Sequence, residues 1–273
     1  MTTRQGGWQV ARRRIDAELA DRGLFPSREQ ARAAVLAGEV RVGGEVVTKA
    51  GHPVTEDALI EVAQRQRFVS RGGDKLNGAL DVFELSVEGA RAVDVGASTG
   101  GFTDCLLKRG ASSVCAVDVG YGQLAWSLRS DERVTVFERT NIRHADPVEL
   151  GAPFDVVVVD VSFISLRVVM DSLLALLGES GDVVALVKPQ FEAGKGRVGK
   201  RGVVRDVEVH VDVLEAAVET MRSEGLVVRG LTFSPLKGPE GNIEFWIWAT
   251  RLGEPTRATA REVAETAHEM LGG

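Results

Sequence analysis

Short, largely apolar runs recur through the middle of the chain, and segments with helical spacing separate them. Five of these runs lie at residues 92–95, 114–117, 134–137, 156–159 and 183–187. Strands that are apolar on both faces are typical of parallel sheets covered by helices on each side. The pattern therefore predicts a doubly wound α/β domain over most of the chain.

Two further apolar runs close this domain, at residues 226–233 and 243–249. Only nine residues separate them, too few for a crossover helix, so we expect the two strands to pair antiparallel. Five parallel strands and such a hairpin resemble the class I S-adenosylmethionine-dependent methyltransferases, which have a Rossmann-like, seven-stranded sheet with the last strand antiparallel. A helix at residues 259–271 is expected to cover one face.

The first part of the chain has a different pattern. Ile15 and Leu19 mark one face of a helix, and Ser27 to Gln30 form a capping-box sequence that begins a second helix. Residues 39–47 alternate around Gly43-Gly44, which predicts a hairpin with a two-residue turn. We expect four parts: a flexible tail at 1–11, a small α+β domain at 12–63, a linker at 64–70 and the α/β domain at 71–273.

The three consecutive arginines at 12–14 and the order of elements in the small domain resemble the S-four type of RNA-binding module. A solvated basic helix on a capping subdomain is the alternative. The resemblance implies RNA contacts by basic side chains of this domain and of the segment that follows it. These are Arg12, Arg13, Arg14, Arg28, Arg32, Arg41, Arg67 and Arg71.

Charge is unevenly distributed along the chain. The formal net charge is −6, but residues 1–75 hold 13 Lys and Arg against 10 Asp and Glu, so an RNA partner remains compatible with the composition. Cys105 and Cys115 form no C-x-x-C motif and no cluster with histidine, so we expect neither a disulfide framework nor a metal site. No apolar run approaches the ~20 residues of a membrane span, and we expect a cytoplasmic protein without a membrane partner.

A glycine-rich loop at residues 96–102 follows the first strand and begins a helix. Such a loop lets the backbone approach a ligand at the helix N-terminus. Asp118 ends the second strand, where a carboxylate can accept hydrogen bonds from both ribose hydroxyls of a bound nucleoside. NAD-dependent oxidoreductases share this geometry, but an antiparallel last strand is uncommon in them, so we favour S-adenosylmethionine. The expected cofactor-binding residues are Asp94, Gly96, Ala97, Ser98, Thr99, Gly100, Gly101, Phe102, Asp118, Val119, Asn141 and Asp160.

Four charged residues form the candidate catalytic set. Asp160 and Lys188 follow the fourth and fifth strands, at the edge where open α/β sheets place their sites. Glu244 on the last strand should lie near Lys188 if that strand inserts beside the fifth, and Lys75 precedes the first strand. Such a set suits a ribose hydroxyl, a poor nucleophile that must be oriented and relieved of its proton.

Residues 93–102 resemble the first motif of the FtsJ-like RNA ribose methyltransferases, and the four charged residues match the K-D-K-E set of that family. Longer strings at 70–76, 118–124, 160–165 and 188–192 are similar to the TlyA (haemolysin A-like) family of rRNA methyltransferases. The resemblance implies 2′-O-methylation of cytidine in ribosomal RNA, with S-adenosylmethionine as donor and ribosomal subunits as partners. Family accounts make Lys188 the general base. Neighbouring carboxylates favour its ammonium form, so our hypothesis is that Lys188 mainly orients the 2′-oxygen.

From Lys188 to Arg205 the chain carries six Lys and Arg, one Glu and several glycines. This segment is expected to grip RNA phosphates through Lys195, Arg197, Lys200 and Arg201, and a mobile solvated loop is the alternative. Three other functions stay open at this point. They are a non-enzymatic ribosome-assembly factor, an NAD-dependent oxidoreductase and a membrane-active haemolysin.

Overall fold

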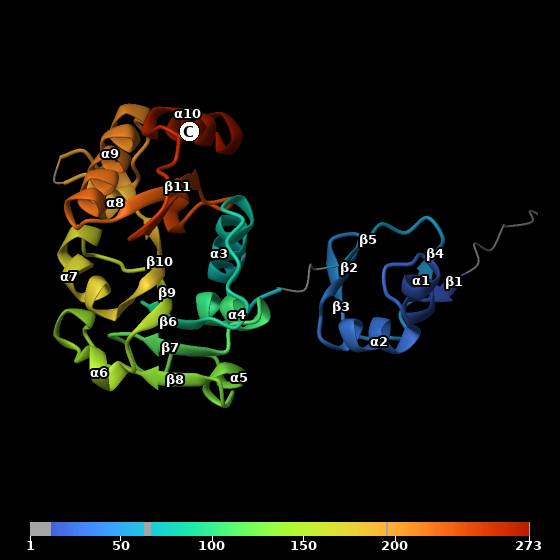
Figure 1. The fold of residues 1–273 in the computed structure, drawn as a ribbon. Helices are drawn as coiled ribbons and strands as arrows, with labels where there is room; N and C mark the ends of the chain where they lie inside the picture. Colours follow the sequence, from blue (N-terminus) through green and yellow to red (C-terminus); the bar gives the residue numbers. More distant parts are fainter. Residues whose placement is uncertain (1–11, 63–66, 195, 273) are drawn as a thin grey trace, which may run out of the picture. The chain divides into compact units, whose positions relative to one another are not determined.

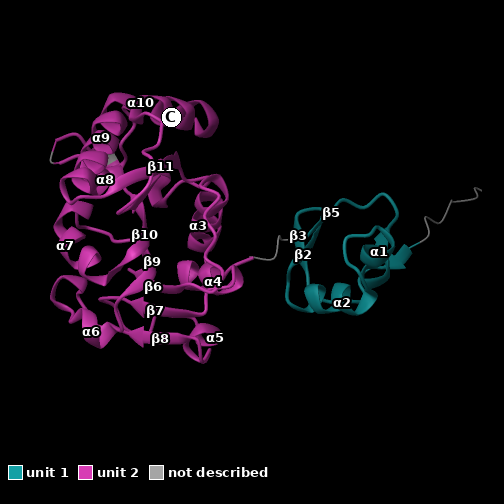
Figure 2. Cartoon of the chain, in the orientation of Figure 1, with its two compact units in different colours: residues 1–66 teal, residues 67–273 magenta. Residues whose placement is uncertain are grey.

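The computed structural model describes residues 12–62, 67–194 and 196–272. It divides into two compact units, Met1–Gln66 and Arg67–Gly273 (Figure 2). The expected tail at 1–11, part of the expected linker and Lys195 lie outside the described residues. Phe68, within the segment assigned to a linker, is buried in the core of the second unit.

The first unit packs two helices against short strands. The helices are α1 (Ile15–Asp21) and α2 (Arg28–Leu36), and the Ser27 side chain caps α2 by accepting from the Gln30 backbone N–H at 3.3 Å. The expected hairpin is confirmed, with Gly43 and Gly44 both at positive φ in its turn. The strands are β1 (Arg12–Arg14), β2 (Val40–Val42), β3 (Glu45–Val47), β4 (Pro53–Thr55) and β5 (Ile60–Val62), in the orders β1-β4 and β3-β2-β5.

A seven-stranded sheet forms the centre of the second unit (Figure 1). The strand order is β11-β12-β10-β9-β6-β7-β8, and β12 is antiparallel to both of its neighbours. This arrangement confirms the expected class I methyltransferase fold. The strands are β6 (Arg91–Val95), β7 (Ser113–Val117), β8 (Val134–Phe137), β9 (Phe154–Val159), β10 (Leu177–Val187), β11 (Val227–Phe233) and β12 (Phe245–Thr250).

Helices cover both faces of this sheet (Figure 1). Side chains of α3, α4 and α5 pack on one face, and those of α6, α7, α9 and α10 pack on the other. Val156 to Val159 of β9 alternate between the two cores, which is why this run is continuously apolar. The helices are α3 (Arg71–Val82), α4 (Gly101–Lys108), α5 (Trp126–Arg129), α6 (Pro147–Leu150), α7 (Leu166–Leu176), α8 (Pro189–Glu192), α9 (Val207–Ser223) and α10 (Ala260–Leu271), with 3₁₀ turns η1 (Ile142–His144), η2 (Lys200–Gly202) and η3 (Pro239–Gly241).

A histidine pair joins α9 to α10. His210 is fully buried, and its Nδ1 lies 2.8 Å from Nε2 of His268. Burial lowers the pKa of His210 to about 4, whereas a histidine in an unfolded chain has a pKa near 6.5. Between these values the unfolded chain binds more protons than the folded one, so acidification favours unfolding.

We therefore expect the His210 contribution to stability to be complete above about pH 6.5 and to fall by about 3 kcal/mol as the pH drops towards 4. Urea unfolding at about pH 7 and about pH 5 gives the free energy of unfolding of the wild type and of a His210→Phe variant. The slope of this free energy against pH should be smaller for His210→Phe than for the wild type. Exposed His144 offers a control, because His144→Phe should leave the wild-type slope unchanged. Equal slopes for wild type and His210→Phe would contradict this assignment.

Candidate functional site

A pocket of about 240 Å³ lies at the carboxyl edge of the parallel strands, and all four candidate catalytic side chains line it. Asp160 and Lys188 follow β9 and β10 directly, as expected from the sequence. Glu244 lies one residue before β12 rather than within it. Because β12 is antiparallel to β10 and Phe245 pairs with Val187, the start of β12 meets the end of β10. Lys75 enters from the first half of α3.

The four side chains form two ion pairs. Lys75 Nζ contacts Glu244 Oε2, and Lys188 Nζ contacts Asp160 Oδ1. The first pair is deeply buried, with the Lys75 side chain 9% and the Glu244 side chain 0% exposed. Lys188 and Asp160 are more open, and Lys188 also donates to Ser162 Oγ at 2.9 Å. The Lys188–Asp160 pair is therefore the more exposed of the two.

Glu244 is held in a buried, crowded position. Burial raises the pKa of its carboxyl group, and the neighbouring Lys75 ammonium opposes that rise. Its Oε1 atom has no hydrogen-bond partner within the described part of the chain. A Cβ atom on Gly238 would lie 2.2 Å from this Oε1, so only glycine leaves room for the carboxylate beside the β11–β12 connection.

The glycine loop forms another wall of the pocket through Gly96, Ala97, Ser98, Thr99, Gly101 and Phe102. Gly96 has φ 91°, and a Cβ there would lie 2.3 Å from the Asp160 backbone oxygen. The loop therefore packs directly against the end of β9, which a side chain at Gly96 would prevent.

Asp94 lies behind the loop and does not line the pocket. It is fully buried, and its Oδ2 accepts hydrogen bonds from Thr103 N at 2.9 Å and Thr103 Oγ1 at 2.7 Å. Burial raises its pKa to about 7. The structure thus places Asp94 where it fixes the start of α4, and its expected contact with the cofactor stays a prediction.

Three other expected cofactor residues lie at the ends of β7 and β8, outside the pocket lining. Asp118 accepts from Ser98 N at 2.8 Å and from Gly120 N at 2.6 Å, so it ties the glycine loop to the next strand. Val119 is exposed, and Asn141 accepts from Arg143 N at 3.1 Å as the cap of η1. Asn141 thus caps a local turn, and its expected contact with the cofactor stays a prediction.

Sequence reasoning missed part of the pocket wall. Ser70, Gly72, Lys237 and Pro239 also line it, and Arg71, which we expected to contact RNA, lines it as well and donates to the Lys237 backbone oxygen at 2.9 Å. Lys237 and Pro239 belong to the connection between β11 and β12. Lys237 lies in a turn rich in glycine and proline, a few residues before Glu244, and this position was the available signal for a place in the pocket. A turn sequence alone does not show which way its side chains point.

The arginines of the first unit are organised by buried carboxylates. Asp16 binds Arg14 at 2.8 Å and Arg28 at 3.3 Å, and Arg13 pairs with Glu18 at 3.2 Å. Hydrogen bonding to Arg14 lowers the pKa of Asp16 to about 2. The three guanidinium side chains remain 50 to 58% exposed, so each is fixed at one side and open to solvent at the other.

The remaining basic residues are more dispersed. Arg12 and Arg32 are exposed, and exposed Arg41 donates to Gly44 O at 2.9 Å. Arg67 is exposed and lies over the Phe68 ring at 5.1 Å. In the segment after β10, Arg197 pairs with Asp212 at 2.5 Å, Arg201 has a left-handed backbone, and Lys200 begins η2.

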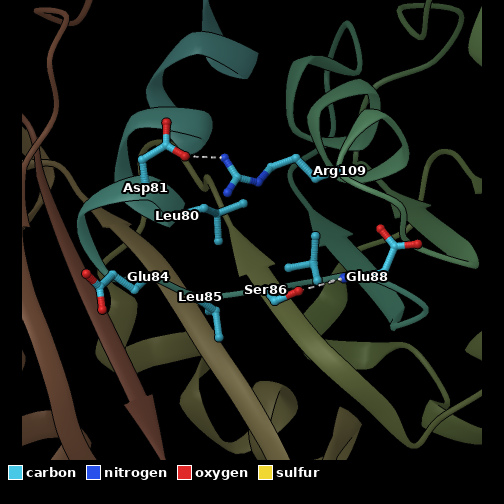
Figure 3. Close-up of a pocket in the computed structure, with 8 residues that line it drawn as sticks. Leu80, Asp81, Glu84, Leu85, Ser86, Glu88 and Arg109 are labelled. Atoms are coloured by element: carbon cyan, nitrogen blue, oxygen red, sulfur yellow. Dashed lines mark hydrogen bonds and ion pairs between the residues drawn. The ribbon is translucent and has the colours of Figure 1, made fainter.

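A second hollow lies at the opposite end of α3 (Figure 3). Asp81, Glu84, Glu88 and Arg109 line it, and Arg109 is paired with Asp81 at 2.6 Å. None of the candidate catalytic or glycine-loop residues contributes to it. This hollow is therefore distinct from the candidate site at the carboxyl edge of the sheet.

Comparison with known proteins identifies a family for each of the two units. The FtsJ-like methyltransferase family matches residues 68–251, and the S4 domain family matches residues 13–60. The 16S/23S rRNA (cytidine-2′-O)-methyltransferase TlyA of Mycobacterium tuberculosis is 49% identical over 265 residues, which cover 96% of this chain and 98% of that protein. Hemolysin A of Brachyspira hyodysenteriae is 41% identical over 85% of this chain and 97% of its own length.

A solved structure of a hemolysin-type protein from Streptococcus thermophilus covers 96% of this chain and 98% of its own, with 42% identity and a TM-score of 0.73. The fold and the site thus define an FtsJ-like methyltransferase, and the chain belongs to that family. Within it, the similarity over nearly the whole chain makes it a member of the TlyA (haemolysin A-like) family. Among residues 12–62, 67–194 and 196–272, no helix is both long and apolar enough to span a bilayer.

Proposed function

We propose that this protein transfers a methyl group from S-adenosylmethionine to the 2′-oxygen of a cytidine in ribosomal RNA. The observation that carries the proposal is the meeting of Lys75, Asp160, Lys188 and Glu244 beside the glycine loop in one pocket. Curated relatives that match nearly the whole chain are named as rRNA (cytidine-2′-O)-methyltransferases. The protein acts in the cytoplasm, where ribosomal subunits are found.

The residues around the glycine loop fit the donor. The loop backbone lines the pocket, and the Asp118 carboxylate keeps lone pairs beyond those used by Ser98 and Gly120 for the ribose hydroxyls of a nucleoside. S-adenosylmethionine supplies an electrophilic methyl group on a positively charged sulfur. No side chain of the chain has to form a covalent bond to that methyl group.

The two ion pairs have different roles in the transfer. Lys188 lies in the more open pair, so its ammonium donates a hydrogen bond that orients the 2′-oxygen and stabilises negative charge on it. The hydroxyl proton passes to solvent water late, as the new carbon–oxygen bond forms and the carbon–sulfur bond of the donor breaks. Asp160 holds this ammonium in place. The buried Lys75–Glu244 pair forms a rigid wall that keeps the ribose in register with the glycine loop.

The first unit holds the RNA. Buried Asp16 and Glu18 fix Arg13, Arg14 and Arg28 with part of each guanidinium exposed. Guanidinium groups recognise phosphate through parallel hydrogen bonds, and less entropy is lost when the side chain is already fixed. This unit therefore binds ribosomal RNA.

Nucleoside mass spectrometry of ribosomal RNA tests the function directly. RNA from cells that lack the gene should lose a 2′-O-methylcytidine, and the wild-type gene should restore it. A gene that encodes Asp160→Ala should not restore the modification, although its product still binds RNA through the first unit. A non-enzymatic assembly factor would be indicated if no methylated nucleoside disappears while subunit assembly is impaired.

A further inference from the structure

A hollow of about 460 Å³ lies beside the segment that follows β10, separate from the catalytic pocket. Arg197, Arg201 and Arg205 line it, and Asp206 is its only carboxylate lining within the described residues. Arg201 has φ 68°, a left-handed conformation that is uncommon for a residue with a side chain. The turn that carries Arg201 must therefore be held by its surroundings.

Asn242 provides the contacts that hold this turn. Its side chain is 2% exposed, donates to Gly202 O at 2.9 Å and accepts from Val204 N at 3.0 Å. A further bond from Gly199 N to Val203 O, at 3.0 Å, closes the turn on itself. One buried amide thus fixes the backbone at Gly202 and at Val204, just after Arg201.

The same asparagine is joined to the catalytic pocket. It lies two residues before Glu244, and its backbone oxygen accepts from Gly238 N at 2.8 Å. Gly238 lies against the Glu244 carboxylate so closely that a Cβ would be 2.2 Å from Oε1. A shift of Asn242 must therefore move Glu244 itself or the residue packed against it.

We propose that the hollow bounded by Arg197, Arg201 and Arg205 binds a phosphate of the RNA backbone, and that Asn242 couples this phosphate to the placement of Glu244. Three guanidinium groups around one hollow suit a phosphate, which accepts paired N–H bonds. Phosphate binding fixes the Arg201 turn, and the hydrogen bonds of this turn fix Asn242. Asn242 in turn fixes the Glu244 carboxylate beside Lys75. The inference rests on the proposed function and makes Asn242 a positioning residue that touches no substrate.

A double-mutant cycle tests the coupling. Arg201→Gly removes the guanidinium while keeping a residue that tolerates positive φ, and Asn242→Ala removes the link. Affinity for ribosomal RNA, affinity for S-adenosylmethionine, the melting temperature and kcat at saturating RNA are measured for each variant and for the double variant. Arg222→Gly, which removes an exposed arginine from α9, serves as the matched loss of charge.

Arg201→Gly should weaken RNA binding and lower kcat, each by about tenfold, a loss equivalent to one charge-assisted contact. Asn242→Ala should lower kcat by about tenfold or more while cofactor affinity stays within about twofold of the wild type. RNA binding should weaken by no more than in Arg201→Gly, because the turn loses one support while its guanidinium groups remain. The double variant should have the kcat of Asn242→Ala alone, because Arg201 can no longer act on Glu244. Arg222→Gly should leave RNA affinity, cofactor affinity and kcat unchanged, and it should lower only the melting temperature because glycine weakens α9.

Additive effects on kcat would overturn the inference, as would unchanged RNA affinity in Arg201→Gly. If Asn242→Ala does not fold, Asn242→Asp replaces it, because aspartate still accepts from Val204 N but cannot donate to Gly202 O. Methyl transfer by the wild type is measured first. If the wild type transfers no methyl group, the proposed function and this inference are both wrong. If the wild type is active but the effects of Arg201→Gly and Asn242→Ala on kcat are additive, the inference alone is wrong.

Discussion

Lys188→Ala should lower methyl transfer by about a thousandfold at saturating RNA and S-adenosylmethionine, the size expected when a charge-stabilising donor is removed from an active site. Lys188→Arg should retain activity to within about tenfold to thirtyfold of the wild type. An arginine keeps the positive charge and the donors but cannot accept a proton. This difference follows if Lys188 orients the 2′-oxygen, as its pairing with Asp160 and Ser162 favours.

The measurement is single-turnover transfer of a labelled methyl group, together with binding of RNA and of S-adenosylmethionine to each variant. Ser162→Ala is the matched control, because it removes one hydrogen bond from Lys188 and leaves the Asp160 ion pair. It should change the rate by only a few fold. If Lys188→Arg is as inactive as Lys188→Ala while both bind RNA and cofactor normally, Lys188 is an obligatory base and our hypothesis about its role is wrong.

Lys75→Met should lower the free energy of unfolding by about 3–5 kcal/mol and abolish measurable methyl transfer. Breaking a buried ion pair leaves an uncompensated charge in a low-dielectric interior, and this costs more than the pair itself contributes. Here the remaining charge would be on Glu244, which is 0% exposed and whose Oε1 already lacks a hydrogen-bond partner in the described structure.

A second variant separates stability from catalysis. Lys75→Met combined with Glu244→Leu replaces the pair by apolar side chains, which is often neutral for stability. The double variant should therefore unfold in urea near the wild-type midpoint yet remain inactive. The exposed pair Arg261–Glu208 provides the control, because Arg261→Ala should change the midpoint far less than Lys75→Met. A double variant as unstable as Lys75→Met would show that packing, and not the unpaired charge, limits stability there.

The sheet and most of the catalytic pocket could be predicted because they depend on strand ends. Asp160 and Lys188 follow apolar strands, and parallel strands bring such residues to one edge. Glu244 could be placed only through the inferred insertion of the last strand, which the register of Phe245 with Val187 bears out. Whether each of the four has the expected chemical role stays a prediction.

Other features depend on contacts that no local pattern records. The strands β1, β4 and β5 have three residues each, too few for an alternation to be detected. Asp94 accepts a hydrogen bond from Thr103, and Asn141 accepts one from the Arg143 backbone. The sequence does not reveal which partner a carboxylate or amide near the end of a strand will bind. The place of Lys237 in the pocket wall likewise follows from how the β11–β12 connection folds back.

The position of β12 has a consequence for how the enzyme matures. Among the described residues it is the last strand along the sequence, yet it occupies an internal place between β10 and β11. The glycine loop, Asp160 and Lys188 are all synthesised earlier, but the pocket lacks one wall until β12 inserts and delivers Glu244 to Lys75. The pocket is therefore completed by a contact between residues far apart in the sequence, and its last wall forms only when the sheet itself is closed.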